Sequence, residues 1–482
     1  MPHFDYCMAP YVEKTYEKEY EDALDEYEKI TDVDDYNTLH EFACDRAMER
    51  TKRLTYQAME ALIHNLNTMH SRAGAQTPFS SLNYGTDTSW QGRLVIKCLL
   101  NATRAGLGNG ETPIFPVQIF KVKEGVNYNP GDPNYDLFKL AIKTSAERLF
   151  PNFSFLDTPF NKEFYKPGDW NSEVAYMGCR TRVMANIYKD HEVTCGRGNL
   201  SFTTINLPRI GLEAKGNTDT FFDILTDRID LVIRQLLHRY KIQCRKKVRN
   251  YPFLMGNGIW IDSDKLDWDD LIESVIKHGT LTIGFIGLAE CLVALTGKHH
   301  GESEDSQKLG LYIIKYMRTR CDRACKEHNL NFSLIATPSE GLAGRFVPLD
   351  RKRFGTLKGI TDREYYTNSF HVPVYYPIKV FQKIQIEAPY HALTNGGHIT
   401  YVELDGDTAK NLDAFERIIR YMHDCGIGYG SINHPVDRDP VCGYVGVIND
   451  ICPRCGRKEG ESVSVEKLRE LRKKFSNVPK YD

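Results

Sequence analysis

The heptapeptide YMGCRTR at 176–182 places one cysteine, Cys179, between a glycine and an arginine. This segment contains no second cysteine at the spacing of a redox pair, which argues against local disulfide exchange. A nucleophilic role would need a base to form the thiolate, and the nearest histidine in sequence is His191. A lone cysteine is also often a small buried hydrophobe. The local sequence therefore leaves a reactive thiol and a packing residue open.

Three of the thirteen cysteines lie close together near the C-terminus. Cys452 and Cys455 form a C-P-R-C knuckle, and Cys442 begins a C-G-Y turn ten residues earlier. A structural zinc ion takes four ligands, preferably thiolate or imidazole. Asp439 stands where a second C-x-x-C would place the fourth ligand, and His434 is the other candidate. The pattern predicts a zinc-ribbon-like module, with an unmetallated loop of free thiols as the alternative.

The elements that must position these residues follow from the hydrophobic pattern. Residues 11–30 and 39–66 read as amphipathic helices, the first with a solvated acidic face. From Asn101 onward, short apolar runs alternate with longer helical stretches, which predicts an α/β domain with buried, largely parallel strands. The expected strands are 113–122, 152–157, 200–208, 280–287, 332–337, 368–374, 398–404 and 429–434. The expected helices are 91–104, 133–148, 217–245, 304–328 and 409–424.

The sequence changes character at about residue 435, where a turn-rich segment precedes a charged helical tail. We therefore expect a large domain over 1–434 and a small C-terminal module over 435–482. The 64 acidic and 62 basic residues nearly cancel, which argues against a protein held to nucleic acid or membrane by bulk charge. No apolar run reaches the roughly 20 residues of a membrane span, and no signal peptide is evident, so a cytoplasmic protein with reduced thiols is expected.

Long motifs spread over the chain resemble the anaerobic, class III ribonucleoside-triphosphate reductases, which are glycyl-radical enzymes. The resemblance runs from about Phe4 to the end. The motifs that carry it are HSRAGAQTPFSSLNYGTD (70–87), AGLGNGETPIFPVQIFKVKEGVNYNP (105–130), LFPNFSFLD (149–157), AYMGCRTRV (175–183), GRGNLSFTTINLPRIG (196–211), ATPSEGLAGRF (336–346), YTNSFHVPV (366–374) and LTNGGHITYVEL (393–404).

The resemblance implies an α/β barrel of ten strands in two five-stranded parallel halves, threaded by a finger loop. Cys179 would be the thiyl-radical residue at the tip of that loop, with Met177 as its neighbour. A thiyl radical can take the 3′ hydrogen of a ribose, a single-sulfur step that needs no second cysteine. Asn199 matches the asparagine that the family places beside the substrate hydroxyls in formate-using members, with a turn residue that opens a strand as the alternative.

Phosphates are bound by backbone N–H groups and by small residues that permit close approach. Four segments have this composition, although each could also be a turn or helix cap: S-R-A-G (71–74), S-S (80–81), T-P-S-E-G-L-A-G (337–344) and T-N-S (367–369). In the context of the family, the expected substrate-binding residues are Ser71, Arg72, Ser339, Gly341, Asn368 and Ser369. G-L-G-N-G (106–110) is better explained as a helix C-cap and turn.

The sequence also departs from the family pattern. Relatives carry an ATP cone and an early part of the barrel with a second active-site cysteine before the matching region, and an R-V-x-G-Y-L radical loop after the zinc module. V-C-G-Y at 441–444 imitates that loop, but Gly443 lies inside the metal-binding pattern and no arginine directly precedes Val441. We therefore expect a partial reductase, either a fragment or one piece of a split enzyme.

The expected ligands and partners are those of the family. They comprise ribonucleoside triphosphates, formate as reductant, ATP and deoxynucleotide effectors, structural Zn²⁺, a radical S-adenosylmethionine activase and a second copy of the chain. Two alternatives remain. The first is another glycyl-radical enzyme such as an acyl lyase, although the lyases have adjacent cysteines at the loop tip whereas Gly178 precedes Cys179. The second is a catalytically inert nucleotide-binding remnant.

Overall fold

Two sheets form the centre of the protein. The computed structural model describes residues 1–28, 36–69, 76–108, 110–434, 437–446, 448, 450–458, 460–475 and 478. The first sheet has the strand order β1-β2-β3-β10-β9 and the second the order β6-β7-β8. Their strands are β1 (Ser81–Tyr84), β2 (Val117–Val122), β3 (Asn152–Phe155), β6 (Asn199–Asn206), β7 (Thr280–Ile286), β8 (Asn331–Ala336), β9 (Thr400–Glu403) and β10 (Tyr429–Asn433).

Most of the strand pairs are parallel, as the apolar runs predict. Strands β1, β2 and β3 pair in parallel, as do β9 with β10 and the three strands of the second sheet. The β3–β10 pair is antiparallel, and a parallel bridge from Ile335 to Gly397 joins the second sheet to the segment before β9. The α/β arrangement is therefore confirmed, whereas the described strands do not establish a closed ten-stranded barrel.

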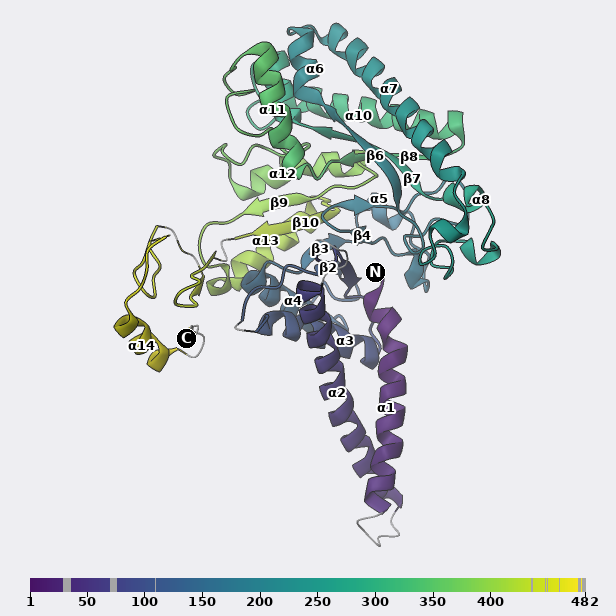
Figure 1. Cartoon of the computed structure of the whole chain (residues 1–482), viewed down its shortest axis with the longest axis vertical. Coiled ribbons are helices and arrows are strands. Elements are labelled where there is room, and N and C mark those ends of the chain that lie inside the picture. Colours follow the sequence, from purple (N-terminus) through teal and green to yellow (C-terminus); the bar gives the residue numbers. More distant parts are fainter. Residues whose placement is uncertain are drawn as a thin grey trace.

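Helices cover the outer faces of both sheets (Figure 1). The longer ones are α1 (Phe4–Glu28), α2 (Tyr36–Thr68), α3 (Trp90–Ala105), α4 (Tyr135–Arg148), α6 (Leu207–Ala214), α7 (Thr218–Cys244), α9 (Leu288–Thr296), α10 (Glu304–His328), α11 (Glu340–Phe354), α12 (Val380–Leu393), α13 (Leu412–Asp424) and α14 (Val465–Lys474). Single-turn helices lie at α5 (Pro159–Lys162) and α8 (Glu273–Ile276).

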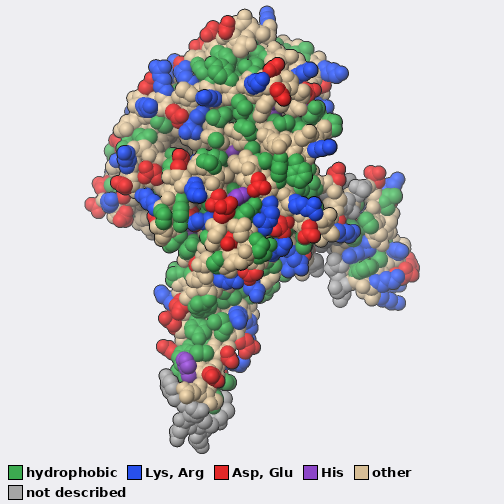
Figure 2. Space-filling view, turned by 180° about the vertical axis from the view of Figure 1, so that it is seen from behind, with side chains coloured by type: hydrophobic (Ala, Val, Ile, Leu, Met, Phe, Trp, Pro, Cys, Tyr) green, Lys and Arg blue, Asp and Glu red, His purple; other side chains and the backbone are tan. Residues whose placement is uncertain are grey.

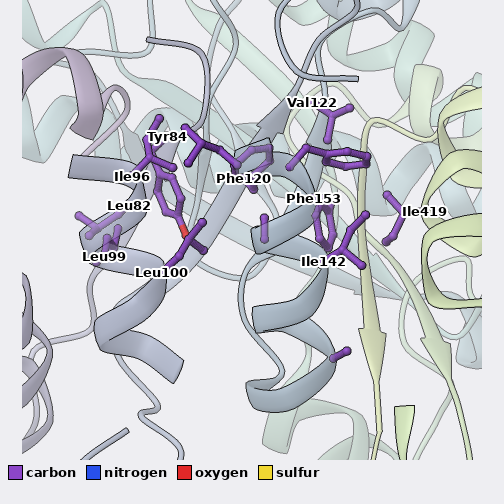
Figure 3. Packing of buried hydrophobic residues seen from close by; sticks show 14 of the residues in the cluster. Leu82, Tyr84, Ile96, Leu99, Leu100, Phe120, Val122, Ile142, Phe153 and Ile419 are labelled. Atoms are coloured by element: carbon purple, nitrogen blue, oxygen red, sulfur yellow. The ribbon is translucent and has the colours of Figure 1, made fainter. Parts of the chain in front are cut away.

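Each sheet has its own apolar core. In the first, Tyr84, Phe120 and Phe153 from three successive strands pack against α3, α4 and α13 (Figure 3). The second core places β6, β7 and β8 against α6, α7, α9 and α10. Strands β2, β7 and β8 are buried along their whole length, as is typical of parallel strands whose two faces are both covered.

The sequence pattern gave one wrong strand. Residues 368–374 form a loop, in which the N–H of His371 donates to the carbonyl of Asn368 at 3.0 Å and Ser369 has φ of +42°. The N–H of Val372 donates to the Glu387 carboxylate rather than to a neighbouring strand. Pro373 has no N–H to offer a sheet, so an apolar run alone was insufficient evidence for a strand here.

Two parts of the chain stand apart from the sheets. Helices α1 and α2 pack side by side and project from the body, and the segment that carries α14 lies to one side (Figure 1).

Acidic and basic side chains are interspersed over the face shown in Figure 2, in keeping with the balanced composition. Among the described residues, no helix combines the length and apolar character needed to cross a bilayer.

Candidate active site

A short hairpin carries Cys179. Its arms are β4 (Tyr176–Met177) and β5 (Thr181–Arg182), paired antiparallel, and Cys179 lies half-buried in the turn between them. Gly178 has φ of +58°, a conformation that costs an L-residue about 1–2 kcal/mol. A Cβ at this position would also stand 3.1 Å from the ring of Phe79. The glycine before the cysteine is therefore required by the shape of the turn.

The first arm of the hairpin is fixed to the first sheet. The side-chain amide of Asn83 on β1 donates to the Tyr176 carbonyl at 2.7 Å and accepts from the Tyr176 N–H at 2.9 Å, as a paired strand would. At the tip, the Gly178 N–H donates to Ser81 Oγ at 3.1 Å, and its carbonyl accepts from the Tyr429 hydroxyl at 3.4 Å. These contacts come from β1 and β10, so the tip is held from two strands.

The second arm is fixed to the second sheet. The Arg180 guanidinium donates to the carbonyls of Ala336 and Thr337 at the end of β8, both at 3.2 Å, and to Ser369 Oγ at 3.3 Å. The Arg182 N–H donates to the Gly396 carbonyl at 2.9 Å. Both arginines are buried, so their hydrogen bonds also serve to offset the cost of removing the charges from water. The hairpin therefore links the two sheets.

Two tyrosines stand close to the tip. Burial raises the pKa of both Tyr401 and Tyr429, and a negative charge on Cys179 would raise it further. The Arg180 guanidinium lies 5.8 Å above the Tyr401 ring and opposes the shift at that residue. Tyr401 and Tyr429 are therefore both close to the half-buried Cys179.

A cavity of about 370 Å³ opens beside Tyr401. We call it the α11 cavity, because Gly341, Ala343 and Gly344 of α11 form one wall; the loop 364–375, α12 and β9 form the rest. Tyr401, which interacts electrostatically with Cys179, connects the cavity with the hairpin tip. Concave sites with few convergent polar groups are where small ligands bind.

The predicted substrate-binding residues divide into two groups. Gly341 and Asn368 line the α11 cavity, and the buried Ser339 donates its N–H to Asn368 Oδ1 at 3.2 Å. Ser369 is also buried and accepts from Arg180, so the structure brings these four residues together at the carboxyl end of β8. The other two, Ser71 and Arg72, lie outside the described residues.

Asn199 and Met177 occupy different positions. Asn199 is the first residue of β6, and its Oδ1 accepts from the hydroxyls of Thr280 and Thr282 on β7, the second at 3.1 Å. These partners belong to the second sheet and not to the hairpin. Met177 is half-buried on β4 and pairs with Thr181 across the hairpin, two residues from Cys179.

Sequence reasoning did not single out Arg180 or Tyr401, although both connect the cysteine to the cavity. The signal for Arg180 was present in the quoted motif, since an arginine beside a buried turn needs partners for its fixed set of donors. Tyr401 lies in the predicted strand 398–404, but only the register of that strand decides which side chain faces the hairpin.

The C-terminal cysteines converge with Asp439. One ligand atom from each of Asp439, Cys442, Cys452 and Cys455 lies within 4.8 Å of the other three. The sulfurs of Cys442 and Cys452 are 3.6 Å apart, close to the about 3.8 Å expected for two thiolates on a tetrahedral zinc. Asp439 Oδ1 accepts from the N–H groups of Val441 and Cys442, and Arg457 donates to Oδ2 at 2.6 Å, so the oxygen that keeps a lone pair for a metal is Oδ2, 3.5 Å from Cys455 Sγ. The donor set fits a zinc ion.

Two other residues near this cluster have different surroundings. His434 Nε2 lies 3.0 Å from the Ser145 carbonyl on α4, so this histidine is not part of the group of four. Gly443 donates its N–H to the Asp439 carbonyl at 2.9 Å and has φ of +69°. It is part of the turn that presents Cys442, as its place inside the metal-binding pattern predicts.

A second cluster, His191, Asp262 and His278, was not predicted. Its imidazole rings are stacked at 16° with centroids 4.6 Å apart, so their in-plane lone pairs do not converge. Asn186 Oδ1 accepts from Asn331, so its Nδ2 donates to His278 Nδ1 at 3.2 Å and places the proton of the neutral ring on Nε2. Hydrogen bonding to Asp262 explains this cluster better than a metal does.

Comparison with known proteins decides the family. The model of the family described as anaerobic ribonucleoside-triphosphate reductase matches residues 1–468. The chain belongs to the anaerobic ribonucleoside-triphosphate reductase family. The reductase of Haemophilus influenzae is 34% identical over 470 residues, which are 96% of this chain and 63% of that protein. The reductase of Enterobacteria phage T4 is 34% identical over 475 residues, 95% of this chain and 73% of its own.

Solved structures of family members agree with the fold of the chain. The Thermotoga maritima anaerobic ribonucleotide reductase in complex with dATP and CTP has a TM-score of 0.60 at 18% identity, over 88% of this chain and 69% of that one. The B12-independent glycerol dehydratase of Clostridium butyricum has a TM-score of 0.57 at 11% identity, over 81% of this chain and 57% of the dehydratase chain. The chain spans 63% of the length of its bacterial relatives.

Proposed function

We propose that this chain is the catalytic part of an anaerobic ribonucleoside-triphosphate reductase, with Cys179 as the residue that carries the thiyl radical. The observation that supports this most directly is the hairpin tip, where a single half-buried cysteine is held between two sheets and near Tyr401, which lines the α11 cavity. Membership of the family supports the reaction, and the α11 cavity supports a ligand of nucleotide size.

In this proposal the Cys179 sulfur removes the 3′ hydrogen of the ribose, forming an S–H bond and leaving an unpaired electron at C3′. The C2′–O bond then breaks, and the hydroxyl leaves as water with a proton. Two electrons, with formate as the donor, reduce the resulting intermediate before the hydrogen returns from Cys179 to C3′. The sum is one ribonucleotide, one formate and one proton converted to one deoxyribonucleotide, carbon dioxide and water.

The protein groups would divide this work. The first turn of α11, with Ser339, Gly341, Asn368 and Ser369, would receive the phosphates, because unpaired N–H groups at a helix N-terminus attract anions. Ser71 and Arg72 would complete that site, Asn199 would hold the sugar hydroxyls and Met177 would pack beside the radical sulfur. We further propose that the described strands are three of one half and all five of the other half of a ten-stranded barrel.

We also propose roles for the C-terminal cysteine cluster, for the partners of the chain and for its two domains. Cys442, Cys452, Cys455 and Asp439 would hold a structural Zn²⁺, which would tie together a module with a small apolar core. The chain would act as a homodimer in the cytoplasm, under ATP and deoxynucleotide control, after activation by a radical S-adenosylmethionine enzyme. Residues 1–434 and 435–482 would be its catalytic domain and zinc module.

The test compares the unaltered chain with Cys179→Ser under strict anaerobiosis. Because R-V-x-G-Y-L does not occur among the 482 residues, the assay supplies it as a peptide together with the activase, S-adenosylmethionine, formate and CTP. We expect deoxycytidine triphosphate from the unaltered chain and none from Cys179→Ser, with CTP binding equal in both. Cys425→Ser, a change at another half-buried cysteine, is the matched control. Reduction by Cys179→Ser would refute the assignment.

A further inference from the structure

His371, in the motif YTNSFHVPV, has a ring nitrogen without a partner. The side chain lines the α11 cavity, is 5% exposed, and its ring centroid lies 5.8 Å from that of Tyr401. Its Nδ1 lies 3.1 Å from Glu387 Oε2. Its Nε2 is buried and makes no hydrogen bond to any described residue. A buried polar atom left unpaired costs about 1–3 kcal/mol, and a ligand that forms a hydrogen bond with this nitrogen would remove that cost.

Glu387 fixes the tautomer of that ring. The carboxylate is fully buried and accepts from the Val372 N–H at 3.0 Å and the Thr400 hydroxyl at 2.9 Å, with Lys383 Nζ at 3.3 Å. Burial alone would raise the pKa of Glu387, but Lys383 and His371 bring it down to about 2. An ionised carboxylate can only accept hydrogen bonds, so Nδ1 of His371 must carry the proton.

The ring is therefore neutral, with the lone pair on a buried Nε2 in the wall of the cavity. Burial lowers the pKa of His371 and outweighs the opposing effect of Glu387, while the nearby Lys383 and Arg180 act in the same direction as burial. With the proton on Nδ1, Nε2 is a hydrogen-bond acceptor. Because Glu387 holds Nδ1 in place, the acceptor has a fixed position, as in other sites where a carboxylate orients a histidine.

The chemistry of this acceptor selects its ligand group. Phosphate oxygens are themselves acceptors at neutral pH, so the donors of a ribonucleoside triphosphate are its sugar hydroxyls and base amino groups. Tyr401, beside the hairpin tip, and Gly341, on the first turn of α11, line the same cavity. A nucleotide with its phosphates at α11 and its reacting carbon at Cys179 would place its sugar between them.

We propose that His371 Nε2 accepts a hydrogen bond from a sugar hydroxyl of the ribonucleotide in the α11 cavity. This inference rests on the proposed function, because it takes that cavity as the nucleotide site. His371 is then a binding residue for the substrate sugar, and Glu387 is a positioning residue that acts through it.

The first test removes either partner of this hydrogen bond. His371→Asn keeps an N–H for Glu387 but loses Nε2. Calorimetry measures the binding of CTP, 2′-deoxy-CTP and 3′-deoxy-CTP to each protein. We expect the unaltered chain to bind CTP about five- to tenfold more tightly than the analogue that lacks the contacted hydroxyl. In His371→Asn that ratio should fall to about one, as in a double-mutant cycle.

The matched control is His300→Asn. His300 is also buried, also has an unpaired ring nitrogen, and lies near the same loop through its bond to the Phe370 carbonyl, but it does not line the cavity. In His300→Asn the ratio of the affinity for CTP to that for the deoxy analogue should equal the ratio in the unaltered chain. An unchanged ratio for both deoxy analogues in His371→Asn would overturn the inference alone. If the unaltered chain does not bind CTP, the proposed function falls and the inference with it.

A second measurement begins with the unaltered protein. In protein labelled with ¹⁵N-histidine, the Nδ1 of His371 should carry the proton in the free protein, and the Nε2 signal should move when CTP is added to saturation. Glu387→Gln can donate to Nδ1 and should shift the proton toward Nε2, because an amide has donors that a carboxylate lacks. A proton on Nε2 in the free protein, or an Nε2 signal that CTP leaves in place, would contradict the proposal.

Discussion

At the scale of single residues, the turn that presents Cys179 depends on a glycine. Gly178→Ala should destabilise the fold by about 1 kcal/mol, because φ of +58° is unfavourable for alanine. The new methyl group would also meet Phe79, whose ring is 62% exposed and can move. The added displacement should shift the tip and reduce deoxynucleotide formation at least tenfold, since small misplacements of a reacting group are costly.

Gly125→Ala is the matched control for this change. Gly125 has φ of +74°, and an added Cβ would have no atom within 4 Å, so it isolates the backbone cost. Urea unfolding should give a similar loss of stability for both variants, whereas only Gly178→Ala should lose activity in the complemented assay. Equal activity of the two variants would show that the shape of the tip does not matter.

The residue scale also shows what the sequence could and could not predict. A motif names residues but not their partners, so Cys179, Gly341 and Asn368 could be proposed, whereas the link through Arg180 and Tyr401 could not. The role of Glu387 was equally hidden, because it stands sixteen residues from His371 on another element. Such pairs depend on tertiary packing, which local patterns do not encode.

At the scale of elements, predictions were best where a segment had a single strong pattern. Helix α10 has the predicted bounds, and α3 and α7 agree with them within one residue at each end. The unpredicted helices α11 and α12 contain Pro348 and Pro389, which usually mark the end of a helix. The C-terminal cysteine pattern is a further case. The spacing of the four expected ligands in the sequence was enough to predict residues whose ligand atoms lie close together in the structure.

The C-terminal module should depend on its metal. Its small apolar cluster comprises Cys442, Cys452, Leu471 and Val478, so the proposed ligands are also its core. Below about 70 residues a core of this size seldom suffices without a metal or disulfide. Chelation should therefore expose the amides of α14 to hydrogen exchange while those of β2 and β7 stay protected. Equal protection of α14 with and without the metal would contradict this role.

Variants at Asp439 separate the ligand from its surroundings. Elemental analysis should find one zinc per chain, Asp439→Cys should bind it more tightly, and Asp439→Ala should bind it at least tenfold more weakly, because thiolate is the preferred ligand. Cys425→Ser, outside the cluster, should leave zinc content unchanged. If Asp439→Ala retained its zinc affinity, Asp439 would be an acceptor for the hydrogen bond from Arg457 and not a zinc ligand.

At the scale of the whole molecule, the two sheets are coupled through the hairpin and the residues around it. His398, in the segment between α12 and β9, is fully buried, with Nε2 2.9 Å from the Tyr176 hydroxyl and Nδ1 2.9 Å from the Thr394 carbonyl. His300 is also buried, with Nε2 2.8 Å from the Phe370 carbonyl. Neutral imidazoles thus form part of the interior that joins hairpin, helices and strands.

This interior makes the fold sensitive to acid. Burial lowers the pKa of His398 to about 3 and that of His300 to about 4, against about 6.5 in an unfolded chain. Below pH 6.5 the unfolded state therefore binds protons at these histidines, whereas the folded state does not. Stability from these groups is complete above pH 6.5 and falls as the pH approaches 4, by up to about 1.4 kcal/mol per pH unit for each histidine.

His398→Gln tests this sign and magnitude. It removes one titrating group, so the free energy of unfolding, measured in urea between pH 7.5 and 4.5, should fall less steeply than in the unaltered chain by up to about 1.4 kcal/mol per pH unit below pH 6. The absolute stability at pH 7.5 should drop by about 1–3 kcal/mol, because Tyr176 loses a buried partner. His328→Gln, at an exposed histidine, controls for loss of an imidazole. Parallel curves for His398→Gln and the unaltered chain would mean that His398 takes up its proton without unfolding.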